Sequence, residues 1–316
     1  MPLTQQIIQN SDTSYLPVAI ECTDNEITVC WLDMKGADLT SPFLSDTISK
    51  VRCRNGRTVI KSDVSLLYQC AKDLSNRCQL SGLLFHTSRC GSTLASQLIS
   101  HTPSCICLSE PQFADQIIRT LKGVVPPEEQ ISLLRAFTQM WLHYLSPGFS
   151  RCFIKLDCWL IHDFDFIADC FPQTQYYFLY RDLSQVIASQ LKIKGAFLIP
   201  QLVPSAYFGL PEPGVRFMEP SEYMLDVLAG IYKRGWQLSK DNQLKKLSYN
   251  DMPENIFKDI LGQPASSEYH NVLTYHAKDK CRVFEDDHDK DKTLLPEVLN
   301  QIQARQSEIE TQYSGG

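Results

Sequence analysis

Short apolar runs alternate with longer segments of helical periodicity along most of this 316-residue chain. The runs predict five strands, at residues 81–86, 105–108, 152–156, 175–180 and 245–249. Helices are predicted between them, among others over residues 111–122 and 127–145. Strands that alternate with helices are typical of a parallel sheet covered by helices. The pattern therefore predicts an α/β fold with three layers, a parallel sheet flanked by helices.

The chain before residue 76 follows a different pattern. Residues 15–32 predict two strands around a Thr-Asp-Asn turn, and helical patterns follow from about Pro42. We therefore expect a small α+β extension over residues 1–75 and the α/β domain over residues 76–316.

The turn after the predicted strand at 81–86 combines Arg89, Gly91, Ser92 and Thr93 at the start of a helical pattern. Backbone N–H groups and the helix dipole at such a turn attract an anion. A nucleotide triphosphatase would carry a lysine directly after the last glycine, together with a hydroxyl for magnesium. No lysine follows Gly91 here, and the cation is Arg89. The loop therefore predicts a phosphate or sulfate site without a metal ion.

A second cation, Arg181, directly follows the predicted strand at 175–180, and Ser189 comes eight positions later on a predicted helix. In open α/β sheets, ligands bind at the carboxyl ends of the strands. Two such ends with arginines and hydroxyls predict a ligand that carries two separated anionic groups.

Together these segments resemble the sulfotransferases that use 3′-phosphoadenosine 5′-phosphosulfate (PAPS), over roughly residues 80–262. The family motif that binds the 5′-phosphosulfate matches Ser88-Arg89-Cys90-Gly91-Ser92-Thr93. Ser88 stands in place of its leading proline, and Cys90 in place of a hydroxyl residue. The second family motif is an arginine after a strand, followed eight residues later by a serine, and both contact the 3′-phosphate. Its match in this chain is Arg181 and Ser189.

A softer match, KLSYNDMPENIFKDILG, would place Tyr249 near the adenine. The glycine-rich Arg-Lys-Gly segment of the small-molecule branch is missing, so the resemblance is to the branch with tyrosylprotein and bacterial sulfotransferases. The resemblance implies a P-loop-like fold, PAPS as cosubstrate, adenosine 3′,5′-bisphosphate as product and an acceptor that carries a hydroxyl. It also implies a C-terminal cation that closes the cofactor site. The available residues are Lys278, Lys280, Arg282 and Lys290.

Two other functions compete with this interpretation. A P-loop kinase is disfavoured because no lysine follows Gly91. A non-catalytic nucleotide-binding or interaction module of the same fold stays open, because binding motifs persist without turnover. The acceptor also stays open.

An acceptor hydroxyl must lose its proton to a nearby base. Glu110 follows the predicted strand at 105–108, and tyrosylprotein sulfotransferases carry their base in a corresponding segment. Glu110 is therefore predicted as the base; alternatively it caps the next helix. His101 is a rival base, at a predicted helix end. Lys155, at another strand end, is predicted to contact the phosphosulfate or to orient Glu110, or else to be an exposed lysine.

Composition bears on the possible partners of the protein and on its location in the cell. The net charge of −6 argues against a general nucleic-acid-binding surface. The chain contains no apolar stretch of about 18 residues and does not begin like a signal peptide, so we expect a cytoplasmic protein.

Its 12 cysteines include no C-x-x-C pair and are expected to be reduced thiols. Residues 200–220, rich in Pro, Gly and aromatics, are expected to form the acceptor-binding wall or a passive loop.

Overall fold

The computed structural model describes residues 14–313, apart from residues 25, 73, 201, 211, 216–217, 265–271, 274, 277–278 and 284–293. A five-stranded sheet has the strand order β5-β6-β4-β7-β8. Its strands are β4 (Gln79–His86), β5 (Cys105–Ser109), β6 (Arg151–Lys155), β7 (Gln175–Tyr180) and β8 (Lys245–Ser248). The pairs β5–β6 and β7–β8 are parallel. The predicted α/β fold is confirmed, and each predicted strand ends within two residues of its expected limits.

A separate antiparallel sheet occupies the N-terminal part of the chain, in the order β1-β2-β3. Its strands are β1 (Tyr15–Thr23), β2 (Glu26–Asp33) and β3 (Ile60–Ser62). The two strands predicted in residues 15–32 are therefore confirmed. Helix α2 (Leu44–Asn55) precedes β3, and α3 (Val64–Ala71) follows it. Helix α3 begins where it does because the Asp63 side chain accepts a hydrogen bond from the backbone N–H of Leu66, 3.2 Å away.

The chain divides into two compact units. The first unit comprises residues 1–83 and 96–174, and the second comprises residues 84–95 and 175–316. Helix α4 (Ser92–Ser100) contributes residues to both. The predicted domain boundary after residue 75 stays a prediction.

The first unit has an aromatic core around helix α6 (Pro127–Leu145). Phe137 and Trp141 of this helix pack against Phe113, with ring centroids 5.1 and 6.5 Å from that ring. The indole N–H of Trp141 donates to the carbonyl of Pro17 at 2.9 Å, which ties the helix to β1. The remaining helical elements of the unit are α5 (Gln112–Asp115), the π-turn η1 (Gln116–Thr120), the 3-10 helix η2 (Cys158–Asp163) and α7 (Phe164–Cys170).

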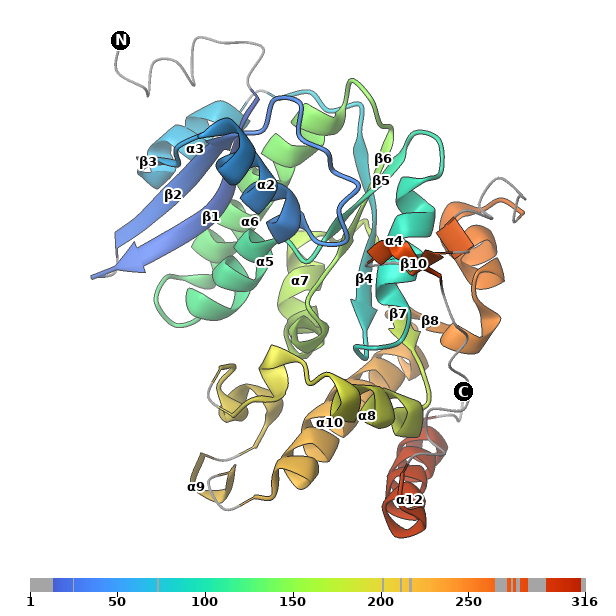
Figure 1. Cartoon of the computed structure of the whole chain (residues 1–316). Coiled ribbons are helices and arrows are strands. Elements are labelled where there is room, and N and C mark those ends of the chain that lie inside the picture. The colour runs from blue at the N-terminus through green and yellow to red at the C-terminus, as the bar shows by residue number, and fades with distance from the viewer. Residues whose placement is uncertain are drawn as a thin grey trace. The chain divides into compact units, whose positions relative to one another are not determined.

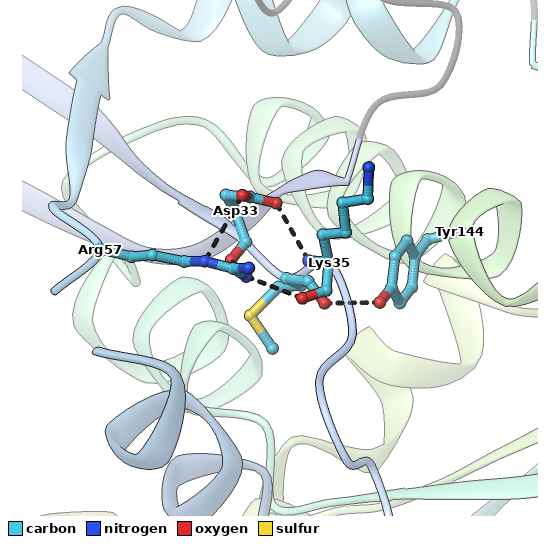
Figure 2. A network of polar contacts seen from close by, with 5 residues as sticks. Asp33, Lys35, Arg57 and Tyr144 are labelled. Carbon is cyan, nitrogen blue, oxygen red and sulfur yellow. Dashed lines mark hydrogen bonds and ion pairs between the residues drawn. The ribbon is translucent and has the colours of Figure 1, made fainter. Parts of the chain in front are cut away.

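A network of polar contacts stabilises the residues at the end of β2 within the first unit (Figure 2). Arg57 donates to the backbone carbonyls of Asp33 and Lys35 at 2.6 and 2.9 Å, and its Nε lies 3.5 Å from the Asp33 carboxylate. The Tyr144 hydroxyl donates to the carbonyl of Met34 at 2.7 Å. Burial raises the pKa of Asp33, but hydrogen bonds from Ser14 and the Lys35 backbone and the charge of Arg57 outweigh it, so the net pKa lies below its ordinary value.

In the second unit, helices α8 (Leu183–Lys192), α10 (Pro220–Lys240) and α12 (Pro296–Tyr313) pack on one another (Figure 1). Tyr180 at the end of β7 contacts the rings of Tyr232 and Trp236 on α10. The N-terminus of α8 is capped from α12, because the Gln306 side-chain oxygen accepts from the N–H of Leu183 at 2.8 Å. These contacts hold α8 at the end of strand β7.

The rest of the second unit consists of short elements. Residues 200–220 contain the turn η4 (Ser205–Phe208) and the short helix α9 (Glu212–Val215), and η3 (Ala196–Leu198) precedes them. After β8 come η5 (Tyr249–Asp251), the π-turn η6 (Ile256–Leu261), β9 (Tyr275–His276) and β10 (Asp279–Val283). Within the described ranges, none of the helices combines the length and the apolar character that crossing a membrane requires.

Candidate functional site

The turn between β4 and α4 is the one that the sequence predicts to bind an anion, and residues 87–91 are called the anion loop from here on. Ser88, Arg89 and Gly91 have φ values of 63°, 48° and 78°. This left-handed conformation is unusual for a residue with a side chain and is found at ligand-binding sites, where the surroundings hold it in place. Ser92 and Thr93 follow as buried residues in the first turn of α4. The loop predicted from the sequence is therefore present at the predicted strand–helix junction.

Several hydrogen bonds stabilise this loop within the second unit. The N–H of Ser88 donates to Nδ1 of His86 at 3.0 Å, and the N–H of Thr87 donates to the carbonyl of Leu179 at 3.1 Å. The Ser88 hydroxyl accepts from the Gln190 side chain at 3.0 Å. The loop is thus attached both to β7 and to α8.

Arg89 is half-buried beside the turn that follows α8. One guanidinium nitrogen donates to the carbonyl of Ile193 at 2.6 Å. Burial lowers the pKa of Arg89 below its ordinary value, but a guanidinium stays charged in proteins. Because a guanidinium has five N–H groups, it can keep this bond and still donate to a phosphate or sulfate.

Cys90 is fully buried, and its thiol lies 3.3 Å from the carbonyl oxygen of Leu179. Burial raises its pKa, but interactions with His86 and Thr87 outweigh burial, so the net pKa lies below its ordinary value. With an exposed fraction of 0%, Cys90 serves as a small packed residue in the loop.

Arg181 lies directly after β7 and is 95% buried, since only 5% of its surface is exposed. Its Nε donates to the side-chain oxygen of Gln185 at 2.5 Å, and its guanidinium carbon lies 4.1 Å from the centroid of the Tyr249 ring. The hydrogen bond and the ring fix the plane of the guanidinium. Arg181 is therefore held in one orientation at the carboxyl end of the strand.

The Tyr249 ring also lies against the anion loop. A Cβ atom added to Gly91 would lie 2.8 and 2.9 Å from Cδ2 and Cε2 of this ring, closer than real Cβ contacts. Gly91 therefore provides both the left-handed backbone and the space for Tyr249. The structure brings Arg181, Tyr249 and the loop together within the second unit. Ser189 lies half-buried on α8 of the same unit.

Glu110 and Lys155 form an ion pair within the first unit. Lys155 is fully buried, its ammonium lies 2.9 Å from the Glu110 carboxylate, and 24% of the Glu110 side chain is exposed. The backbone N–H of Glu110 donates to the carbonyl of Lys155 at 2.6 Å, and Glu110 has a φ of 50°. Lys155 is therefore not an exposed strand-end lysine, and the orienting contact with Glu110 is present.

The ammonium of Lys155 lies 4.9 Å from the centroid of the Phe43 ring. It is close to the Glu110 carboxylate, yet no hydrogen bond of good geometry joins it to a protein atom in the described part of the chain. Two opposite charges 2.9 Å apart attract each other whatever the angle, so Glu110 and Lys155 form an ion pair. A buried ammonium with donors still to satisfy is suited to a further anionic partner.

Two alternatives to Glu110 as the base were that Glu110 caps the next helix and that His101 is the base. Helix α5 has Pro111 at its N-cap position and no side-chain hydrogen bond to the cap, so Glu110 does not cap it in this way. His101 is exposed, and its Nδ1 lies 2.8 Å from the carbonyl of Gln97 in the preceding helical turn. That contact matches the expected role of a histidine at a helix end. The role of Glu110 as base stays a prediction.

Sequence reasoning missed Gln185, Gln190 and His86, which contact the predicted site residues. The two glutamines interrupt the apolar face of α8 and are buried, with exposed fractions of 8% and 0%. A polar residue in an apolar stripe was the available signal, but its partner depends on tertiary packing.

Two further predictions concern cations and metals. Of the four proposed C-terminal cations, Lys278 and Lys290 lie outside the described residues, and Lys280 and Arg282 lie in β10. Among the residues that the structure describes, no three His, Cys, Asp or Glu side chains are grouped so that they could hold a metal ion.

The solved structures to which this chain is similar include several sulfotransferases. The chain is similar to the sulfotransferase domain from the curacin biosynthetic pathway (17% identity, TM-score 0.44), with 75% of this chain and 98% of that chain covered. It is also similar to a sulfotransferase from Mycobacterium avium (11% identity, TM-score 0.47; 78% and 81% covered). A third, from Alicyclobacillus acidocaldarius, has 12% identity and a TM-score of 0.42, with 75% and 97% covered.

No protein-family model matches the sequence, and no curated protein is significantly similar to it. Identities of 17% or less and TM-scores below 0.5 do not bear on activity, cosubstrate or acceptor. The function must therefore be inferred from the side chains of this chain.

Proposed function

We propose that this protein transfers a sulfuryl group from PAPS to the hydroxyl of an acceptor, in the cytoplasm. The observation that supports this most is the placement of the Tyr249 ring between Arg181 and the glycine of the anion loop. A loop with Arg89 on one strand end and an oriented arginine on the next provide two anion sites within one unit. PAPS and its product carry two such groups, at the 5′ and 3′ positions.

In the proposed mechanism, Arg89 and the loop N–H groups bind the 5′-phosphosulfate, and Ser92 and Thr93 donate to the same oxygens. Arg181 and Ser189 bind the 3′-phosphate, and Tyr249 lies at the adenine. As the acceptor oxygen bonds to sulfur, the bond from sulfur to the 5′-phosphate oxygen breaks and its electrons stay on the phosphate. Arg89 stabilises that charge, and adenosine 3′,5′-bisphosphate leaves.

The proton of the acceptor hydroxyl passes to Glu110 in this proposal. Lys155 orients the Glu110 carboxylate through their ion pair, and it is a further candidate to contact the phosphosulfate. The charge of the transferring group is neutralised by arginine and lysine side chains, so the mechanism needs no metal ion. The expected partner is an acceptor molecule that carries a hydroxyl and is not a nucleic acid.

Adenosine 3′,5′-bisphosphate is expected to raise the melting temperature of the protein, and ATP with magnesium is expected to raise it much less. A ligand that binds only the native state at about 100 times its Kd adds about 2.7 kcal/mol to the free energy of unfolding. Thermal unfolding with each nucleotide at equal concentration measures the difference. Equal stabilisation by the bisphosphate and by ATP would contradict a site that recognises a 3′-phosphate. Binding without product from PAPS would identify a non-catalytic module.

Arg181→Lys is expected to weaken binding of the bisphosphate by about 1–3 kcal/mol, the range for hydrogen bonds to charged groups. A lysine keeps the charge but loses the planar, paired donors that Gln185 and Tyr249 orient. Isothermal titration calorimetry measures the change. Arg305→Lys, at an exposed position of α12, is the matched control and should bind as the wild type does. Unchanged affinity in Arg181→Lys would mean that another residue holds the 3′-phosphate.

A further inference from the structure

Gln190 is a fully buried polar side chain on α8, with an exposed fraction of 0%. Its side-chain oxygen accepts from the backbone N–H of Gly195 at 2.8 Å, and its side-chain nitrogen donates to the Ser88 hydroxyl at 3.0 Å. Because a backbone N–H can only donate, the amide oxygen must face Gly195 and the NH₂ group must face Ser88. Gln190 therefore bridges the anion loop and the turn that follows α8.

The bridge is attached at a strained point of the loop. Ser88 and Arg89 both have positive φ values, 63° and 48°, which cost free energy for residues with a side chain. Such a conformation persists only where neighbouring contacts over-determine it. Gln190 holds the Ser88 side chain, and the carbonyl of Ile193 holds the Arg89 guanidinium at 2.6 Å. Without the Gln190 amide, the loop loses the hydrogen bond that attaches Ser88 to α8.

The same helix also carries the residue that orients the other arginine. Gln185 accepts from Nε of Arg181 at 2.5 Å, five positions before Gln190 along α8. A single rigid helix therefore contacts both anion sites through buried glutamines. The helix and these two side chains connect the loop to Arg181, in addition to the hydrogen bond from the Thr87 N–H to the Leu179 carbonyl of β7.

We propose that Gln190 is a positioning residue that sets the place of the anion loop relative to Arg181. It thereby selects ligands by the separation of their two anionic groups. The inference rests on the proposed function, because it takes adenosine bisphosphates as the ligand class. It predicts discrimination between adenosine 3′,5′-bisphosphate and its 2′,5′ isomer, which carry the second phosphate on different ribose oxygens and therefore differ in that separation.

The test is calorimetric titration of Gln190→Met with both isomers. Methionine keeps the length and fills the buried space, but it makes neither hydrogen bond. We expect Kd for the 3′,5′ isomer to rise roughly 5–30-fold, as for the loss of two buried hydrogen bonds. The preference for the 3′,5′ over the 2′,5′ isomer should fall towards one. Gln303→Met, an exposed glutamine on α12, is the matched control and should keep both values.

Ser88→Ala removes the same hydrogen bond from the loop side and should reduce the isomer preference in the same direction. Its effect should not add to that of Gln190→Met, because both variants lose the hydrogen bond between Gln190 and Ser88. If Gln190→Met fails to fold, the isomer preference of Ser88→Ala decides, and an unchanged preference overturns the inference. A lower melting temperature of Gln190→Met with an unchanged preference also overturns it, since a purely structural role predicts that result. Failure of the wild type to bind either isomer would instead overturn the proposed function.

Discussion

Glu110→Gln is expected to lower turnover roughly 10²–10⁴-fold, with the affinity for adenosine 3′,5′-bisphosphate unchanged. Glutamine keeps the shape of the side chain and one acceptor oxygen, but it cannot take the proton of the acceptor. Release of the bisphosphate from PAPS, with a hydroxyl acceptor that the wild type uses, measures the loss. Arg89→Ala should instead reduce both affinity and turnover, because Arg89 binds the phosphosulfate and stabilises the leaving phosphate.

The ion pair with Lys155 adds a second expected effect of Glu110→Gln. Lys155 is fully buried, so removal of the nearby carboxylate leaves its charge poorly compensated. We expect a loss of about 1–3 kcal/mol in the free energy of unfolding, less than for a fully buried pair because Glu110 is 24% exposed.

A second acid–lysine pair of the first unit provides a control for the loss of a carboxylate. In this pair Lys122, which is 63% exposed, lies 2.7 Å from the buried Asp163 carboxylate. Asp163→Asn should keep its turnover and should lose less stability than Glu110→Gln, because the charge of Lys122 stays hydrated and burial already raises the pKa of Asp163. Near-normal turnover of Glu110→Gln, together with reduced stability, would mean that Glu110 serves only as the partner of Lys155. His101 would then be the residue to replace.

Gly91→Ala is expected to lower the free energy of unfolding by about 2–4 kcal/mol and to abolish measurable bisphosphate binding. The left-handed φ of 78° costs about 1–2 kcal/mol for alanine. The new methyl group would also collide with the Tyr249 ring, whose atoms lie 2.8 and 2.9 Å from its position, and with the side chain of Met252. The methionine can move aside, but a shift of Tyr249 removes the ring that packs on Arg181.

Gly262→Ala is the control for the backbone contribution. Gly262 lies in the same unit and has a φ of 72°, but a Cβ added to it would meet no atom within 4 Å. Gly262→Ala should therefore lower the free energy of unfolding only by the cost of a left-handed backbone for alanine, about 1–2 kcal/mol. It should leave bisphosphate binding intact. Denaturant unfolding and calorimetry of both variants give the comparison. Equal stability and equal binding in the two would show that the contact between Gly91 and Tyr249 does not matter for the site.

The order and type of the main elements could be predicted from local patterns. The apolar runs at 81–86 and 175–180 correspond to β4 and β7, because a strand needs about five consecutive residues that fit a buried sheet. The turn with Gly91 also follows from local chemistry, since a tight strand-to-helix turn needs a residue that accepts positive φ. Arg181 at the strand end was found by the same reasoning.

Local patterns were less informative where a helix departs from regular geometry. The helix predicted over residues 111–122 consists of four α-helical residues followed by the π-turn η1. Strand β8 ends at Ser248, and Tyr249 begins a 3-10 turn, where the sequence suggested a strand residue. These differences concern hydrogen-bond register, and periodicity over a few residues does not resolve it.

By itself, the sequence determined the succession of strands and helices, the glycine turn and the position of two arginines at strand ends, because short-range sterics and periodicity decide these. Only the tertiary structure decided the strand order β5-β6-β4-β7-β8, since it depends on contacts between distant segments. It also decided that Lys155 is buried beside Glu110 and that Tyr249 packs between Gly91 and Arg181. The hydrogen-bond partner of a buried polar side chain depends on which residue, distant in the sequence, the fold places next to it. For Gln190 this residue is Ser88, and no local sequence pattern specifies it.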